Sequence, residues 1–295
     1  MAKLLLGKEV TDALNSDLIR RTAALRQAGV IPTLAMVRIG ADPSDLSYER
    51  GAGKRAELVG VEVQTRELSA DASREAVLDI LDDLNADPAV HGVLLFRPLP
   101  AHLRSCENEI FNRLDPNKDV DCMTPLSKAG VFEGLPELGF APCTAAACME
   151  ILDFYGIDCT GKTAAVIGRS LVVGRPAAMM LTGRNATVTV CHTKTPDPAK
   201  ICRDADLILS AAGKLGSLTK DFVRPGQIVI DVAINWDPEK PNSRGTLGCI
   251  AGDAVFPEVE PIVEAITPVP GGVGAVTTSV LMKHVVEAAE RTMGG

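Results

Sequence analysis

The stretch Thr163–Leu181, "TAAVIGRSLVVGRPAAMML", contains a short apolar strand, a turn with two glycines and the start of a helix. Gly168 ends the strand where a tight turn is needed, and Gly174 lets the backbone approach a phosphate closely. Pro176 suits the first turn of a helix, whose free amide groups face an anion. The stretch therefore predicts a dinucleotide-binding turn. Its GRSxxxG spacing differs from GxGxxG, so an ordinary strand–helix turn is the alternative.

The strand that follows this turn suggests which dinucleotide binds. It ends in "VCHTKT", residues 190–195, which contains no carboxylate. An Asp or Glu at this place usually binds the free ribose 2′-hydroxyl of NAD. Arg169, Thr193 and Lys194 instead offer cations and a hydroxyl that suit the 2′-phosphate of NADP. We therefore expect NADP, with NAD as the alternative cofactor; a solvated strand end is the structural alternative for His192 and Lys194.

Strand and helix patterns alternate on both sides of this turn, which is typical of an α/β chain with parallel sheets. We expect strands over residues 32–40, 60–68, 90–96, 163–168, 186–192, 206–213 and 227–235, and helices over 10–28, 47–60, 73–88, 143–157 and 276–292. The last four strands form a small doubly wound sheet. A stretch rich in proline and glycine, from Pro116 to Gly139, separates the two halves and is the best candidate for a domain boundary.

Composition excludes several classes of protein. The 295 residues are 46% hydrophobic, enough for about two domains with large cores. The sequence contains neither an apolar run long enough for a membrane span nor a secretory signal, so we expect a cytoplasmic protein that binds no membrane. A net charge of −8 without long runs of one sign argues against a nucleic-acid surface. The eight cysteines lack zinc-site spacing, and we expect reduced thiols and no metal site.

Five motifs then occur in an order that points to one family. They are "NKDVD" (117–121), "VIGRSLVVGRP" (166–176), "VTVCHTKT" (188–195), "VIDVAIN" (229–235) and "ITPVPGGVG" (266–274). From about Leu4 to Ala289, the chain resembles the methylenetetrahydrofolate dehydrogenase/cyclohydrolase family. The resemblance implies a two-domain α/β enzyme that oxidises 5,10-methylenetetrahydrofolate with NAD(P), takes tetrahydrofolate as its co-substrate and forms a homodimer through its cofactor domains.

The resemblance also implies a domain division and a set of site residues. Residues 1–140 and 270–295 form the folate-binding catalytic domain, to which the C-terminal helix returns, and 141–269 form the Rossmann-like NAD(P)-binding domain. Tyr48 and Asp121 match catalytic and folate-binding residues, for which a surface ring and a helix cap are the structural alternatives. The other implied positions are Pro270, Gly271 and Gly272 for folate, and Gly168, Arg169, Ser170, Gly174, Thr193, Ile234 and Gly274 for the cofactor.

The sequence departs from the family at residues that serve the hydrolase reaction. Bifunctional members have a lysine four residues after the tyrosine, where this chain has Ala52. Lys54 lies six residues after Tyr48, roughly 240° around a helix, and therefore points away from the tyrosine. A "QLPLP" segment of the family reads "FRPLP" here, with Phe96 for glutamine and Arg97 for leucine. A smaller departure is Ala275 in place of proline.

Both main departures remove groups that position and activate water, whereas hydride transfer needs mainly geometry. We therefore expect an NADP-dependent dehydrogenase and doubt the cyclohydrolase activity. One alternative is the ordinary bifunctional enzyme, with Lys54, Arg55 or Arg97 replacing the missing lysine. An alternative of another class is a non-catalytic dinucleotide-binding regulator.

Overall fold

The computed structural model describes residues 1–241 and 246–293 and divides the chain into two compact units. The six-stranded unit contains residues 1–11 and 144–277. The three-stranded unit contains residues 12–143 and the C-terminal segment from Thr278. This division corrects the expected boundaries at both ends of the chain. Residues 1–11 join the six-stranded unit because β1 (Lys3–Leu4) pairs with β11 (Ala265–Ile266) in its sheet.

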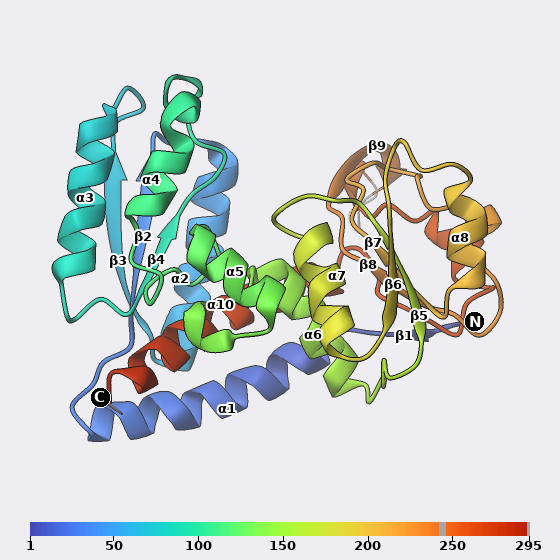
Figure 1. Cartoon of the computed structure of the whole chain (residues 1–295), viewed down its shortest axis with the longest axis horizontal. Helices are drawn as coiled ribbons and strands as arrows, with labels where there is room; N and C mark the ends of the chain where they lie inside the picture. Colours follow the sequence, from blue (N-terminus) through green and yellow to red (C-terminus); the bar gives the residue numbers. More distant parts are fainter. Residues whose placement is uncertain (242–245, 294–295) are drawn as a thin grey trace. The chain divides into compact units, whose positions relative to one another are not determined.

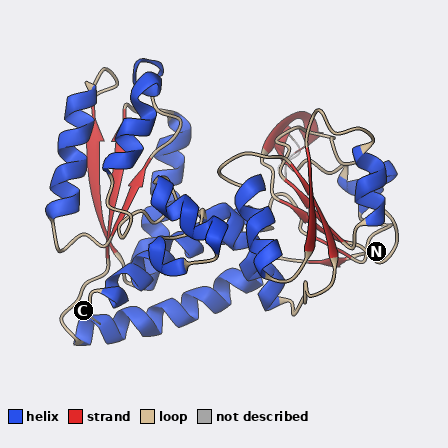
Figure 2. Ribbon diagram, in the orientation of Figure 1, coloured by secondary structure: helices blue, strands red, loops and turns tan. Residues whose placement is uncertain are grey.

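The three-stranded unit has a parallel sheet in the order β3-β2-β4. Its strands are β2 (Thr33–Ile39), β3 (Glu62–Leu68) and β4 (Gly92–Leu95). Its helices include α2 (Pro43–Val59), α3 (Arg74–Ala86), α4 (Glu107–Arg113), α5 (Pro125–Glu133) and most of α1 (Gly7–Gln27), with short 3₁₀ turns at Ala101–Cys106 and Pro136–Leu138. Helices lie beside this sheet (Figures 1 and 2). The expected strands and helices are present, and the proline-rich stretch also contains short helices.

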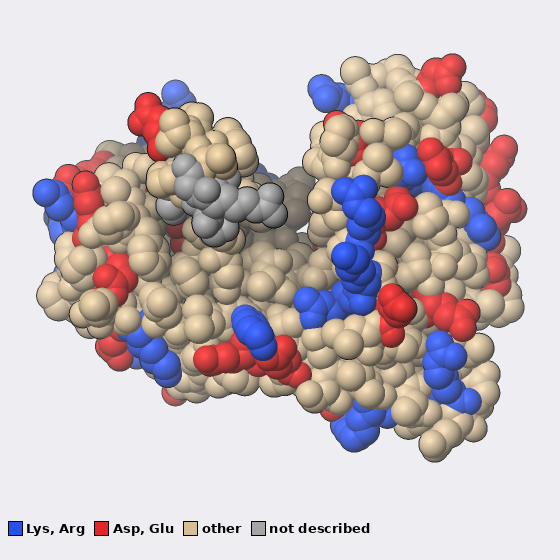
Figure 3. Space-filling model, turned by 180° about the vertical axis from the view of Figure 1, so that it is seen from behind, with Lys and Arg blue, Asp and Glu red and all other residues tan. Residues whose placement is uncertain are grey.

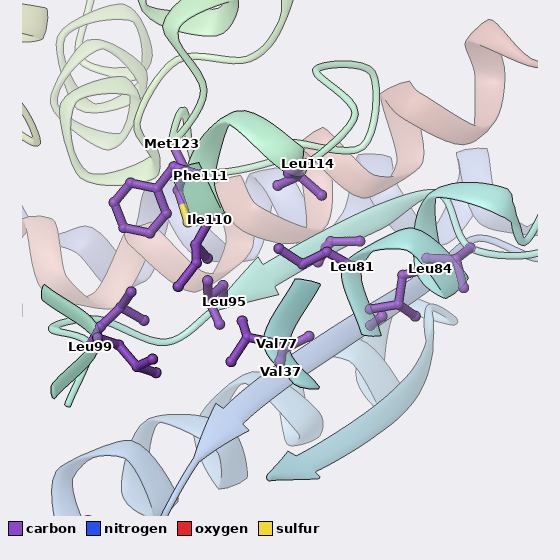
Figure 4. Close-up of a cluster of buried hydrophobic side chains, with 14 residues drawn as sticks. Val37, Val77, Leu81, Leu84, Leu95, Leu99, Ile110, Phe111, Leu114 and Met123 are labelled. Carbon is purple, nitrogen blue, oxygen red and sulfur yellow. The ribbon is translucent and has the colours of Figure 1, made fainter. Parts of the chain in front are cut away.

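Local sequence signals set the ends of these helices. The Asp42 carboxylate accepts a hydrogen bond from the Ser44 amide at 2.8 Å, and α2 ends at Gly60 with a left-handed φ of 80°. Ser73 caps α3 by accepting from the Ala76 amide at 3.2 Å. Buried side chains of β2, β4, α3 and α4 then pack into one apolar cluster (Figure 4). This cluster holds the end of β4, where the "FRPLP" segment begins.

The six-stranded unit has a sheet in the order β1-β11-β8-β7-β5-β6, in which every pair is parallel. Its central strands are β5 (Thr163–Ile167), β6 (Thr187–Cys191), β7 (Leu207–Ser210) and β8 (Ile228–Asp231), as the sequence predicts. Its helices include α6 (Cys143–Phe154), α7 (Gly174–Gly183), α8 (Pro198–Asp204) and α9 (Phe256–Val259), with a 3₁₀ turn at Lys220–Phe222. An antiparallel pair, β9 (Asn235–Pro241) and β10 (Leu247–Ala251), was not expected.

The last helix, α10 (Val273–Arg291), begins in the six-stranded unit and ends in the three-stranded unit, so the expected return of the C-terminus is confirmed. Within the three-stranded unit, the Ser279 hydroxyl donates to Asn15 Oδ1 at 3.0 Å. His284 Nδ1 lies 2.9 Å from the Val120 carbonyl oxygen. A Cβ at Gly92 would lie 2.9 Å from a methyl group of Val285, so α10 packs directly against the start of β4.

Acidic and basic side chains are interspersed over the face seen in Figure 3. Within the described residues, no helix combines the length and apolar character that crossing a membrane requires. All eight cysteines are free thiols, and six of them are buried.

Candidate functional site

The turn between β5 and α7 is shaped by two glycines. Gly168 has a φ of 118°, and a Cβ there would lie 2.3 Å from the Ala211 carbonyl oxygen. A Cβ at Gly174 would lie 2.2 Å from the carbonyl oxygen of Gly168. The Ser170 hydroxyl oxygen accepts from the amides of Val173 and Gly174 at 3.1 and 3.3 Å. Backbone segments of the turn therefore approach one another closely at the start of α7. The absence of side chains at the two glycines suits the binding of a diphosphate at this helix start.

The remaining predicted cofactor residues follow neighbouring strands. Thr193 comes after β6, which pairs with β5, and Ile234 comes after β8. Because the strands are parallel, their carboxyl ends lie along one edge of the sheet. Ile234 is 65% exposed, and a Cβ at Gly274 would lie 3.5 Å from its Cδ1. Arg169 is exposed. The structure thus gathers the predicted cofactor positions at the edge where a dinucleotide would bind.

The segment after β6 is held by its own hydrogen bonds. The His192 amide donates to Thr195 Oγ1 at 2.9 Å, and the Lys194 amide donates to His192 Nδ1 at 3.1 Å. The next carboxylate along the chain, Asp197, caps α8 by accepting from the Lys200 amide at 3.1 Å. The Asp197 carboxylate is therefore already hydrogen-bonded at the start of α8.

The loop before α10 is packed against the N-terminal segment of the same unit. The Gly7 amide donates to the Gly271 carbonyl at 2.8 Å, and a Cβ at Gly7 would lie 2.1 Å from the Gly272 carbonyl oxygen. Gly271 has a φ of 104°, and the Val269–Pro270 bond is cis. The folate positions predicted in this loop therefore belong to the six-stranded unit.

Tyr48 and Asp121, by contrast, belong to the three-stranded unit. Tyr48 lies on α2, is 37% exposed and meets the ring of Phe96 edge-on, with centroids 5.9 Å apart. Desolvation, reinforced by Cys143 and Asp121, raises the pKa of Tyr48. Its phenol is therefore protonated at neutral pH, and it serves as a ring to stack on and as a hydrogen-bond donor.

Asp121 is held from two directions. Its Oδ1 accepts from the Cys143 amide at 2.9 Å, and its Oδ2 accepts from Arg97 Nη2 at 2.7 Å. The guanidinium carbon of Arg97 lies 5.9 Å from the centroid of the Phe111 ring. The Arg97 and Asp121 side chains are 23% and 19% exposed. Sequence reasoning noted Arg97 as a departure from the family but missed that it pairs with Asp121.

Two uncharged side chains, Cys143 and His284, contact the carbonyl of Val120, the residue before Asp121. The Cys143 thiol donates to the Val120 carbonyl at 3.2 Å and lies 3.7 Å from His284 Nδ1. Burial raises the pKa of Cys143 and lowers that of His284, so both groups are uncharged at neutral pH. The thiol is therefore not a thiolate and the imidazole is not an imidazolium, and through the Val120 carbonyl both groups hold the segment that carries Asp121.

The other two charges of the "NKDVD" motif are structural. Asp119 is fully buried and accepts from the amides of Met123 and Thr124 at 2.8 and 2.7 Å. Lys118 Nζ donates to three backbone carbonyls at and just beyond the end of α3, those of Leu84, Asn85 and Asp87. Asp121, by contrast, is partly exposed and keeps acceptor sites that a ligand could use.

Exposure along α2 distinguishes Ala52 from Lys54. Ala52 is fully buried, Arg55 is half-buried and Lys54 is exposed. The amine of Lys54 thus lies off the buried face of the helix, and the position one turn after Tyr48 holds a methyl group.

Both halves of the chain match models of one protein family. Residues 5–121 match the model of the tetrahydrofolate dehydrogenase/cyclohydrolase catalytic domain, and residues 142–293 match the model of that family's NAD(P)-binding domain. The chain belongs to this family. The match gives the six-stranded unit its role as the NAD(P)-binding part and identifies the three-stranded unit with the catalytic domain.

Relatives of the tetrahydrofolate dehydrogenase/cyclohydrolase family are similar over their whole length. A "Bifunctional protein FolD" of Carboxydothermus hydrogenoformans is 47% identical over 290 residues, which cover 98% of both chains. The FolD structure from Campylobacter jejuni has a TM-score of 0.92 at 37% identity and covers 99% of this chain and all of its own. A Trypanosoma brucei FolD structure, complexed with NADP and an inhibitor, has a TM-score of 0.90 at 32% identity, covering 100% and 99% of the two chains.

Proposed function

We propose that this protein oxidises 5,10-methylenetetrahydrofolate to 5,10-methenyltetrahydrofolate by hydride transfer to NADP. The observation that carries the proposal is Asp121, a partly exposed carboxylate held by Arg97 and Cys143, beside Tyr48 in a chain that also has the glycine turn. Asp121 would accept hydrogen bonds from the amino and amide nitrogens of the pterin, and Tyr48 would orient the ring. Pro270, Gly271 and Gly272, which belong to the six-stranded unit, are also proposed to contact folate.

The chain's residues would bind and align the reactants rather than donate or remove protons. NADP, when bound, supplies the nicotinamide that accepts the hydride. The turn from Gly168 to Gly174 fits its diphosphate because a Cβ at either glycine would collide with backbone atoms. Ser170, Ile234 and Gly274 would line the same site. The apolar ring of Phe96 beside Tyr48 would help to exclude water from the reacting carbon.

The test is NADP reduction followed at 340 nm with and without methylenetetrahydrofolate. Reduction that depends strictly on the folate is the expected result. Binding of NADP without folate-dependent turnover would instead support the non-catalytic dinucleotide-binding regulator.

We further propose that NADP is preferred over NAD because Arg169 and Thr193 stand where an acidic ribose reader would. Arg169 is exposed after β5, and the Asp197 carboxylate is engaged as a helix cap. A charged contact to the 2′-phosphate is worth about 1.5 to 3 kcal/mol, or roughly ten- to a hundredfold. Arg169→Ala should lower the ratio of kcat/KM for NADP to that for NAD by this factor. Equal efficiency with both cofactors in the unmodified enzyme would contradict the preference.

The proposal also covers the cyclohydrolase reaction, the hydrolysis of the methenyl product. Ala52 and Phe96 place a methyl group and an aromatic ring where a lysine and a glutamine would handle water, and Lys54 is exposed. We propose that hydrolysis of the methenyl product is absent or weak. The bifunctional alternative is favoured by the names of relatives such as the Carboxydothermus protein. Loss of methenyltetrahydrofolate, measured without NADP and against the spontaneous rate, separates the two.

A homodimer formed through the six-stranded units also remains a proposal. Strand β6 lies at the edge of its sheet, and Val190 on it is exposed. An edge strand with exposed apolar side chains is suited to pair with a second copy. Sedimentation equilibrium of the purified chain tests this, and a monomer at micromolar concentration would contradict it.

A further inference from the structure

We propose that Arg97 and Asp121 act together to read the lactam edge of the pterin, so that Arg97 is a specificity-determining residue. In this arrangement Asp121 accepts from N3–H and the 2-amino group, and Arg97 donates to the 4-carbonyl oxygen. The inference rests on the proposed function, because it assigns partners within the same folate site.

The count of donors and acceptors supports this arrangement. Each carboxylate oxygen has two lone pairs. The Cys143 amide uses one on Oδ1 and Arg97 uses one on Oδ2, which leaves a lone pair on each oxygen for a ligand. A guanidinium has five N–H donors, and the bond to Asp121 takes one of them. The pair therefore presents acceptors and donors side by side.

The lactam edge of a 4-oxopterin carries the complementary groups in the same order. Its N3–H is a donor and the adjacent 4-carbonyl is an acceptor. In a 4-amino pterin the order reverses, because N3 becomes an acceptor and the 4-substituent a donor. An acceptor beside a fixed cationic donor thus matches the first ring and opposes the second.

The surroundings of Arg97 hold its guanidinium in place for this role. It donates to the Asp121 carboxylate at 2.7 Å, its carbon lies 5.9 Å from the centroid of the Phe111 ring, and its side chain is 23% exposed. Because the guanidinium group is partly desolvated and already held in one orientation, it loses little conformational entropy when it binds a ligand. Arg97 also supplies a cation to a site whose α2 face has Ala52 in place of the family's lysine.

The experiment measures binding of folic acid and its 4-amino analogue aminopterin to the full chain by calorimetry. These ligands differ only at C4. The unmodified protein should prefer folic acid, and Arg97→Leu should weaken folic acid about ten- to a hundredfold while leaving aminopterin unchanged or tighter. Arg113→Leu, which breaks the exposed pair with Asp82, is the matched control and should change neither affinity.

A third ligand, 6-methylpterin, distinguishes the lactam edge from the glutamate tail, which it lacks. Arg97→Leu should weaken this ligand by the same factor as folic acid. An unchanged affinity for 6-methylpterin would place Arg97 on the tail and overturn the inference. Tighter binding of folic acid to Arg97→Leu would also overturn it, because Arg97 would then compete with the ligand for Asp121.

Two further readouts separate the inference from the proposed function and from misfolding. A wild-type protein that binds folic acid and aminopterin equally, yet reduces NADP with methylenetetrahydrofolate, overturns the inference alone. One that neither binds folic acid nor reduces NADP overturns the proposed function. Arg97→Lys keeps a cation without the fork and should give an intermediate preference, which tests the inference if the leucine variant fails to fold.

Discussion

In the turn after β5, backbone atoms determine the shape of the site, whereas Asp121 is held by one side chain, Arg97, together with one backbone amide. A Cβ at Gly168 or Gly174 would meet a carbonyl oxygen at 2.3 or 2.2 Å. At Asp121 the geometry depends on Arg97 and on the Cys143 amide. In the first region a Cβ added at Gly168 or Gly174 would collide with backbone atoms. In the second region the geometry depends on a side-chain pair, which a single substitution at Arg97 would remove.

The largest effect is expected at the glycine turn. Gly168→Ala forces a Cβ into the Ala211 carbonyl at a φ of 118°, and should cost about 2 to 6 kcal/mol or abolish NADP binding. Gly183→Ala on α7 is the control, since a Cβ there meets no atom within 4 Å and should be neutral or stabilising by up to about 1 kcal/mol. Urea unfolding and NADP titration measure both. Normal NADP affinity in Gly168→Ala would show that backbone space at this turn is not required for cofactor binding.

The buried carboxylate of Asp231 tests whether a side chain also contributes to the stability of the six-stranded unit. Asp231 accepts from the amides of Ala233, Asp253 and Ala254, and burial raises its pKa from 3.8 to about 6. Because the folded state holds this proton more tightly, its stabilising contribution is complete below pH 4 and is lost as pH rises through 6. The loss is about 2 to 3 kcal/mol.

Asp231→Asn should therefore flatten the change in unfolding free energy between pH 4 and 7. Its absolute stability should fall, since an amide nitrogen would face a backbone donor. Asp82→Asn on the surface is the control. If the difference between wild type and Asp231→Asn is the same at every pH in this range, the carboxyl has an ordinary pKa.

Beside Asp121, a smaller change should act on one ligand alone. Asp121→Asn presents amide hydrogens to a donor-rich pterin edge and should weaken folate binding by about 1 to 3 kcal/mol. NADP affinity should remain unchanged. Equal weakening of both ligands would show that Asp121 supports the fold rather than the pterin.

The smallest effect is expected at Lys54, which is exposed on α2. Lys54→Ala should leave dehydrogenase turnover within a few-fold and should not change methenyl hydrolysis. Strong hydrolysis that disappears in this variant would establish a bifunctional enzyme and overturn the helix-phase argument.

The turn after β5 and the surroundings of Asp121 also differ in how well the sequence could predict them. The glycine turn was predictable because a single residue type at one position reports the need for backbone space. The helix phase of Ala52 and Lys54 was predictable because it depends on local geometry. The pairing of Asp121 was not, because its partners lie 24 and 22 residues away in the chain. Strands β1 and β11 were also missed, because a two-residue strand has no recognisable alternation.

The helix α10 has a consequence for how the chain is made. Val285 and His284 pack against Gly92 and Val120, so the three-stranded unit needs residues of α10 to complete its core. At translation rates of 5 to 20 residues per second, the segment 12–143 waits on the order of ten seconds for that helix to leave the ribosome. The six-stranded unit, whose last residue is Thr277, has all its strands earlier. The three-stranded unit is therefore expected to complete its core only after α10 has been synthesised.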